Sequence, residues 1–147
     1  MERDPFLQAA VDEAKLSLSQ GGIPIGSVLV SEGIIIGRGH NCRVQTGSAI
    51  DHGEMNCLRN AGRLPSSVYR NSSMYSTLSP CPMCSGAIVL YKIPHVIVGE
   101  NQNFLGAEDY MRSEGVRVDV VQDAECIRLM RKFIAENPNL WNEDIGV

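Results

Sequence analysis

Two short stretches of the chain have the residue types and the spacing of a metal site. One is His52-Gly53-Glu54 and the other is Ser79-Pro80-Cys81-Pro82-Met83-Cys84. One imidazole and two thiols make three ligands, and Glu54 remains as a carboxylate that the metal does not need. A structural zinc ion takes four protein ligands, whereas a catalytic one takes three and leaves the fourth position to water. The inventory therefore favours a catalytic zinc ion over a structural one.

The spacing within each stretch suits this chemistry. Cys81 and Cys84 lie three positions apart, so on a helix their sulfur atoms emerge on one face. Flanking prolines place the pair at a helix start, where the backbone amides and the helix dipole favour the thiolate. Glu54 follows His52 by two positions, so its side chain points beside the metal and not onto it. We expect His52, Cys81 and Cys84 to hold one Zn²⁺ ion per chain, and Glu54 to act first as general base and then as general acid.

Each stretch alone is ambiguous. A Cys-x-x-Cys pair by itself is more often a structural zinc site or a redox motif, and a histidine near a carboxylate is common on helix surfaces. The combination favours a catalytic centre, because each stretch begins a predicted helix and no fourth protein ligand is evident. The soft donor set favours zinc over other thiolate-binding metals. On the residues alone, a non-catalytic structural zinc module is the alternative.

The surrounding pattern predicts alternating helices and strands. Helices are predicted from Pro5 up to Gly21-Gly22 and over residues 52–61, 82–91, 107–113 and 123–137, and strands over residues 25–30, 34–39, 74–78, 95–99 and 116–121. The first two strands form an antiparallel hairpin across Ser31-Glu32-Gly33. Alternation of this kind implies right-handed crossovers and a sheet covered on both faces. We therefore predict an α/β fold, a three-layer α/β/α sandwich with a five-stranded mixed sheet, and the zinc ion between the two ligand helices.

Composition limits the class of protein. A length of 147 residues with 44% hydrophobic residues predicts a single domain over residues 1–147. The net charge of −4 provides no positive field for a phosphate backbone, so we expect no nucleic-acid partner. Five cysteines, at least two of them metal ligands, imply no disulfide framework. We find no signal peptide and no membrane-spanning run, so we expect no membrane partner and a cytoplasmic location, with the nucleus open as a second one.

The two stretches together match the H-x-E and P-C-x-x-C signature of the zinc deaminases. At these positions the chain resembles the cytidine deaminase superfamily, and over nearly its whole length it resembles the fungal cytosine deaminases. The further matching segments are Gly22-Ile23-Pro24-Ile25-Gly26, Gly37-Arg38-Gly39-His40-Asn41, Val98-Gly99-Glu100-Asn101, Asn103-Phe104 and Trp141-Asn142-Glu143-Asp144-Ile145-Gly146. The last segment discriminates most, because deaminases of transfer RNA and of nucleosides are not expected to share it.

The resemblance implies a function and a binding site. The implied reaction is the hydrolytic deamination of free cytosine to uracil and ammonia in pyrimidine salvage, extending to 5-substituted cytosines, by a homodimer. The implied substrate-binding residues are Asn41, Gly53, Ser79, Cys81, Phe104, Trp141 and Asp144. An amide such as Asn41 can pair with the O2 and N1–H edge of cytosine, and Asp144 can accept a hydrogen bond from its amine. Phe104 and Trp141 would stack on the ring.

The same residues have plainer interpretations without the resemblance. Asn41 could be a turn residue after a strand, Phe104 and Trp141 could be core residues, and Asp144 could be a solvated residue of the tail. A transfer-RNA adenosine deaminase is the alternative enzyme, since it shares the zinc ligands. Such an enzyme would want a basic surface and a pocket open to a nucleotide chain, which the net charge and the tail segment disfavour.

Overall fold

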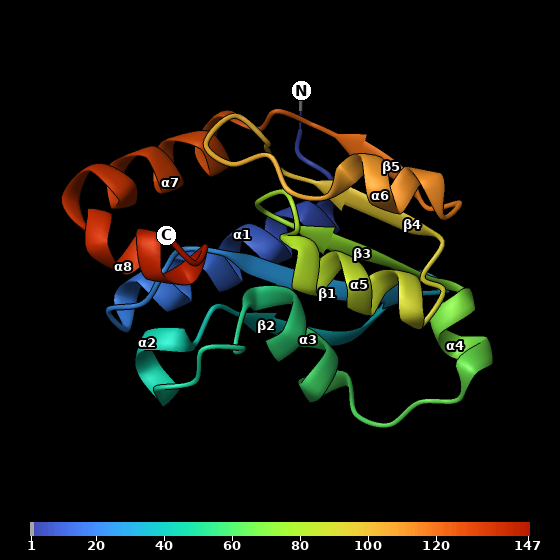
Figure 1. The fold of residues 1–147 in the computed structure, drawn as a ribbon. Helices are drawn as coiled ribbons and strands as arrows, with labels where there is room; N and C mark the ends of the chain where they lie inside the picture. The colour runs from blue at the N-terminus through green and yellow to red at the C-terminus, as the bar shows by residue number, and fades with distance from the viewer. Residues whose placement is uncertain (1) are drawn as a thin grey trace.

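The computed structural model describes residues 2–147 and consists of a mixed sheet between helices (Figure 1). The elements in chain order are α1 (Pro5–Ser19), β1 (Gly26–Ser31), β2 (Ile34–His40), α2 (Arg43–Thr46), α3 (Gly53–Ala61), α4 (Ser66–Arg70), β3 (Ser72–Ser76), α5 (Pro82–Leu90), β4 (His95–Val98), α6 (Glu108–Ser113), β5 (Arg117–Val120), α7 (Ala124–Glu136) and α8 (Pro138–Asp144). The five strands lie in the order β2-β1-β3-β4-β5. β1 is antiparallel to β2 and β3, whereas β3, β4 and β5 run parallel. The predicted three-layer arrangement and mixed sheet are confirmed.

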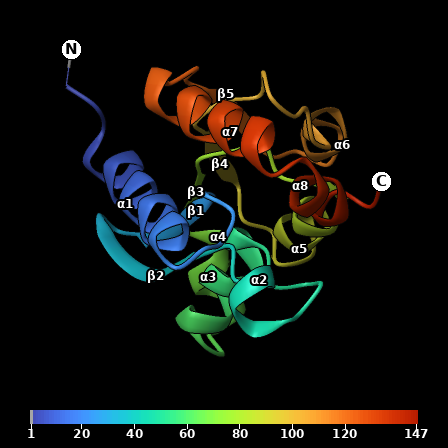
Figure 2. The same ribbon diagram turned by 90° about the vertical axis from the view of Figure 1, so that its left-hand side faces the viewer.

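Alternation along the strands divides the apolar core between the two faces of the sheet. Val28 and Val30 of β1 pack with Leu7 and Ala10 of α1 on one face. Leu29, between them, belongs to the larger cluster on the other face, under α3, α5 and α6. Because successive side chains of a strand point to opposite faces, a strand buried on both sides reads as a continuous apolar run. Figure 2 shows the result, with α1 and α5 on opposite sides of the sheet.

A third apolar cluster lies under the last two helices and next to the site described below. It is formed by Ile23, Ile25, Leu78, Met130, Phe133 and Trp141. Helix α7 begins at Asp123, whose side chain caps the amides of Glu125 and Cys126. Lys15 of α1 reaches Glu125 of α7 at 2.7 Å, so α7 lies beside α1. The chain then turns at Asn137 into α8, which brings the C-terminal residues back over the sheet end (Figure 1).

The capping and turn residues that predicted the helices and strands lie at the ends of these elements in the structure. Asp4 caps α1 by accepting a hydrogen bond from the amide of Phe6, and Pro5 is the first helical residue. The β1–β2 hairpin closes through Glu32 and Gly33, which have φ angles of 52° and 75°. Positive φ at both central residues is the geometry of a two-residue hairpin turn whose twist matches that of the strands.

Some boundaries differ from the prediction. The prediction lacked the short helices α2, α4 and α8, which have four, five and seven residues and are therefore too short to show a helical apolar period. Strand β3 covers residues 72–76 and not 74–78, because its register is set by pairing with β1, where Ser72 lies opposite Ser31. Among residues 2–147, no helix is both long enough and apolar enough to cross a membrane.

Candidate active site

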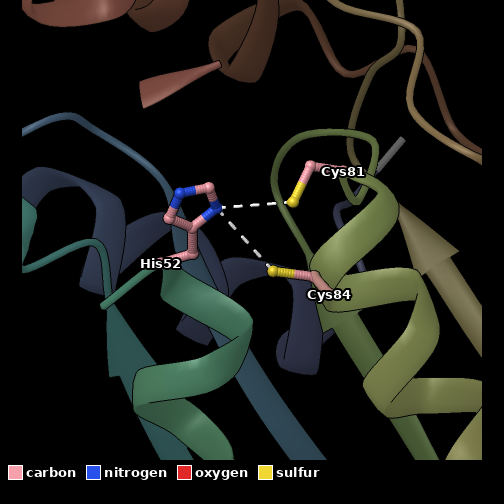
Figure 3. A group of neighbouring side chains, drawn as sticks. All are labelled: His52, Cys81 and Cys84. Atoms are coloured by element: carbon pink, nitrogen blue, oxygen red, sulfur yellow. Dashed lines mark hydrogen bonds between the residues drawn. The ribbon is translucent and has the colours of Figure 1, made fainter. Parts of the chain in front are cut away.

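Two helix starts bring the three predicted metal ligands together. His52 is the N-cap residue of α3, with extended backbone angles, and Cys81 is the N-cap residue of α5. Cys84 lies one turn into α5. The Nδ1 atom of His52 is 3.5 Å from the Sγ atom of Cys81 and 3.8 Å from that of Cys84, and the three side chains point toward one another (Figure 3).

These distances fit a tetrahedral zinc ion. With Zn–S bonds of about 2.3 Å and a Zn–N bond of about 2.0 Å, tetrahedral ligand atoms lie about 3.6 Å apart. The three ligand atoms all lie within 4.8 Å of one another, and among residues 2–147 theirs is the one such grouping of histidine, cysteine and acidic side chains. The donor set of two thiols and one imidazole suits zinc. The chain thus offers three ligands, and Glu54 is not among them.

The two thiols differ in acidity because they share a proton. Hydrogen bonding with Cys84 lowers the pKa of Cys81 to about 4, and the same interaction raises the pKa of Cys84 well above its ordinary value. Burial lowers the pKa of His52, but its hydrogen bond with Cys81 and the charges of Asp144 and Glu54 outweigh burial and raise that pKa to about 9. Metal binding therefore releases protons from this cluster.

Glu54 lies beside the ligands in a position suited to proton transfer. It is the second residue of α3 and is only 4% exposed. Burial raises the pKa of Glu54 to about 7, with a further increase from the negative Cys81 and an opposing effect of His52. A carboxylate with a pKa near the working pH both accepts and returns a proton readily. The geometry is consistent with the predicted acid–base role.

A small cavity lies in front of the ligands. It is lined by Ile25, His52, Glu54, Leu78, Cys81, Phe104, Trp141, Asp144 and Ile145 and offers about 20 Å³ to the centre of a water-sized molecule. Phe104 and Trp141 meet edge to face, with ring centroids 5.8 Å apart. Helix α8 supplies Trp141 and Asp144, so the segment predicted from the resemblance does form one wall. Most of the predicted site residues therefore converge on one cavity, although they come from distant parts of the chain.

Asn41, Gly53 and Ser79 are not among the residues that line the cavity. The Asn41 side chain donates a hydrogen bond to Asp144 Oδ1 at 3.1 Å, and the backbone N–H of Asn41 donates to the carbonyl of Ile25. Asp144 Oδ1 is also 3.4 Å from Nε2 of His52. A carboxylate on the outer nitrogen of a ligating histidine fixes the orientation of the ring. Asp144 thus contacts both a predicted ligand and a predicted substrate-binding residue.

The sequence prediction missed part of the cavity lining. Ile25, Leu78 and Ile145 line the cavity but are not among the predicted site residues, although Ile25 and Ile145 lie inside matching segments quoted above. Their apolar side chains carry no chemical signal that separates a pocket wall from a core. Ile25 belongs to the third apolar cluster, which continues into the cavity wall.

Comparison with known proteins decides the family. A family model described as the cytidine and deoxycytidylate deaminase zinc-binding region matches residues 1–100. The chain belongs to the cytidine and deoxycytidylate deaminase family. Zinc is accordingly the metal of this site, and His52, Cys81 and Cys84 form the group that can hold it.

Individual members of the deaminase family differ in their likeness to the chain. The chain is 56% identical over 141 residues to a cytosine deaminase of Candida albicans (strain SC5314 / ATCC MYA-2876), covering 95% of this chain and 94% of the relative. It is 40% identical over 146 residues to a tRNA-specific adenosine deaminase of Streptococcus pyogenes serotype M18 (strain MGAS8232), covering 92% of this chain and 91% of the relative. A solved structure from a study of A-to-I editing by tRNA:A34 deaminases matches with a TM-score of 0.72 and 27% identity, covering 86% of this chain and 99% of that chain.

Proposed function

We propose that the chain is a zinc-dependent hydrolase that converts free cytosine to uracil and ammonia. The observation that carries this proposal is the 56% identity to a cytosine deaminase over 95% of the chain, compared with 40% to a tRNA-specific adenosine deaminase. The small cavity beside the metal ligands supports a free base as substrate. Helix α8 covers the cavity with Trp141 and Asp144, which leaves little space for a sugar or a nucleotide chain.

The residues around the cavity take the following roles in this proposal. When bound by His52, Cys81 and Cys84, zinc supplies the Lewis-acid chemistry that activates a water molecule. Glu54 accepts a proton from the water as the water oxygen attacks C4, and it delivers that proton to N3. Glu54 then passes the second proton to the amine, the C4–N bond breaks, and ammonia leaves uracil. Both protons of the water thus end on nitrogen.

The remaining predicted residues bind and orient the base. Phe104 and Trp141 hold the faces of the ring, and the Asp144 carboxylate accepts a hydrogen bond from the exocyclic amine. Asn41, which already donates to Asp144, pairs with the O2 and N1–H edge once the ring displaces part of the wall. The carbonyl of Ser79 and the amides of Gly53 and Cys81 provide backbone contacts. The tight cavity requires the wall to move when the ring enters.

A panel of three substrates tests the proposal. Purified protein with its zinc content measured is given cytosine, cytidine or adenosine, and turnover is followed by ultraviolet absorbance, with Glu54→Gln as the blank. We expect loss of cytosine alone and dependence on Glu54. Comparable turnover of cytidine would refute the restriction to free bases. No turnover of any of the three by zinc-loaded protein would refute the proposed activity, and a transfer RNA anticodon stem-loop would then test the alternative enzyme.

Four further features belong to the proposal. The enzyme acts in pyrimidine salvage and accepts 5-substituted cytosines, which the same assay measures with 5-methylcytosine. It works as a homodimer, which the exposed apolar side chains Ile50, Leu90 and Leu105 support, since they are 55%, 68% and 66% exposed. Light scattering at working concentration tests the dimer. All five cysteines are free, which fits a reducing compartment such as the cytoplasm.

A further inference from the structure

A buried carboxylate outside the cavity contacts the loop that carries the metal ligands. Glu108, the first residue of α6, is 3% exposed, and its Oε2 accepts a hydrogen bond from the Ser79 hydroxyl at 2.6 Å. The Asn101 side chain donates to both carboxylate oxygens, each at 3.3 Å. The Ser79 hydroxyl in turn accepts the amide of Gly106 at 2.9 Å. No role proposed above uses this carboxylate.

These contacts tie two walls of the site together. One is the Ser79-Pro80-Cys81 loop after β3, and the other is the 99–107 loop after β4, which carries Phe104. The two loops also touch through their backbones, since the Ala107 amide donates to the Pro80 carbonyl at 3.0 Å. A Cβ atom on Gly106 would lie 1.8 Å from that carbonyl oxygen, so the approach requires glycine. The Ser79 hydroxyl sits at the junction, where it donates one hydrogen bond to Glu108 and accepts one from the Gly106 amide.

We propose that Glu108 is a positioning residue for the deamination: its buried carboxylate, acting through the Ser79 hydroxyl, holds the Ser79 backbone and the Phe104 loop in their binding positions. The inference rests on the proposed function for the identity of the substrate. The mechanism is geometric, because the single hydroxyl proton of Ser79 points to Glu108, which leaves the hydroxyl lone pairs directed at the Gly106 amide. Loss of the acceptor frees the hydroxyl to rotate, and the Phe104 loop then loses its hydrogen bond to the Ser79 side chain and keeps only the backbone contact to Pro80.

Glu108→Gln is the direct test. The new amide group has one oxygen where the carboxylate has two, so it cannot accept from both Ser79 and Asn101. When its oxygen turns to Asn101, its NH₂ group faces the Ser79 hydroxyl, which then loses its acceptor. We expect kcat/KM for cytosine to fall about 10- to 100-fold, as for other outer partners of a site, mainly through KM, with zinc content unchanged. Trp141 is the single tryptophan and contacts Phe104, so acrylamide quenching of its fluorescence should increase.

A second substitution separates positioning from a general loss of stability. Asn101→Asp, added to Glu108→Gln, supplies an acceptor for the new amide while still accepting the Gln122 side chain, which now donates to Asn101 Oδ1 at 2.6 Å. The double variant should regain most of kcat/KM and the original quenching. Asp109→Asn is the matched control, because Asp109 is exposed and lies 3.8 Å from Arg112, the same arginine that lies 3.6 Å from Glu108. The control should behave like the unmodified protein.

The outcomes are distinct. Unchanged KM and quenching in a folded Glu108→Gln variant would overturn the inference, and so would a folded double variant that stays impaired. Where Glu108→Gln fails to fold, Ser79→Ala breaks the same tie and must show the same rise in KM and quenching. If the unmodified protein does not deaminate cytosine, the proposed function fails, and the fluorescence experiment still decides whether Glu108 anchors the Phe104 loop.

Discussion

The metal-ligand side of the cavity and its substrate-facing wall are built in different ways. On the ligand side, His52 and Cys81 are the N-cap residues of two helices that pack on one face of the sheet, and Cys84 lies one turn further on. On the wall, Phe104 comes from a loop, and Trp141 and Asp144 come from a seven-residue helix near the end of the described chain. The ligand side rests on the larger core cluster, whereas the wall rests on the smaller third cluster.

Metal chemistry and substrate selectivity therefore reside in separable parts of the molecule. Helix starts position the ligands with few degrees of freedom, so the metal chemistry is fixed by short motifs. The wall depends on contacts between segments that lie far apart in the chain, such as the Asn41–Asp144 hydrogen bond. We therefore expect changes on the ligand side to abolish the reaction, and changes on the wall to alter which substrates bind and how tightly.

The largest effect is expected from removal of a ligand. His52→Ala and Cys84→Ser each leave two ligands, so zinc binding should weaken enough for the purified protein to lose the metal together with all measurable activity. Metal analysis by mass spectrometry checks this. The control is Cys126→Ala, which removes a buried thiol of α7 outside the site and should leave zinc binding stoichiometric. Full zinc occupancy in either ligand variant would remove that residue from the ligand set.

The next largest effect distinguishes the role of the general base Glu54 from that of the metal ligands. Glu54→Gln keeps the shape of the side chain but removes the group that carries protons, so kcat should fall by about 10²- to 10⁴-fold. Zinc content and the midpoint of thermal unfolding should stay close to those of the unmodified protein. Retained turnover would show that another group transfers the protons, and lost zinc would show that Glu54 supports the metal.

A smaller effect is expected on the wall. Trp141→Ala should raise KM for cytosine about 5- to 150-fold, since stacking of a base on an aromatic side chain contributes about 1–3 kcal/mol. Zinc content should not change, which contrasts this wall with the ligand side. Tyr91→Ala removes an aromatic side chain that is 45% exposed and outside the cavity, and it should leave KM unaltered. A drop in zinc content in the Trp141 variant would contradict the separation of the two parts.

The smallest effect is expected from a change that alters stability but neither the metal-ligand side nor the substrate-facing wall of the cavity. Asp123 caps α7 and pairs with Arg3 at 2.8 Å. Burial raises its pKa, but the hydrogen bonds from Arg3 and the Cys126 amide outweigh burial and lower that pKa below its ordinary value. Asp123→Ala should therefore reduce the free energy of unfolding by about 1 kcal/mol at pH 7, with kcat and KM unchanged.

The pH dependence gives the sign of this last contribution. A carboxylate whose pKa is lowered in the folded state stabilises the fold fully at pH values above its pKa in the unfolded state, which is about 3.9. This stabilisation disappears as the pH falls through the pKa of the folded state. The stability difference between Asp123→Ala and the unmodified protein should therefore be full at pH 7 and should shrink below about pH 4. Denaturant titrations at several pH values measure it. A difference that grew on acidification would contradict the assignment.

The ligand side was predictable from sequence because its signals are local. The spacing of Cys81 and Cys84, the flanking prolines and the helix that starts at His52 act over a few residues, and the structure brings all three ligands together. The sheet was predictable for a related reason, since apolar runs and turn residues mark strands and their ends.

The wall could not be derived from local signals. Asp144 and Trp141 look like tail residues until α8 folds over the sheet end, and the resemblance to a known family was needed to select them. Glu108 gave no signal at all, because a glutamate in the first turn of a short helix is ordinary on a surface. Only the packing of α6 against the Ser79 loop buries it. Contacts of this kind depend on the tertiary arrangement and not on any spacing in the chain.

The parallel pairing of β3 and β4 has a consequence for protein engineering. Because the two strands run side by side in the same direction, the loops after them leave from the same end of the sheet. The loop after β3 carries Cys81 and leads into α5, which holds Cys84, whereas the loop after β4 carries Phe104. The part of the second loop around Phe104 can therefore be redesigned without altering the strands that support the first. Libraries aimed at new bases should therefore vary residues 102–105 and the α8 segment, while residues 52–54 and 79–84 stay fixed together with Asn101 and Gly106, which connect the two loops.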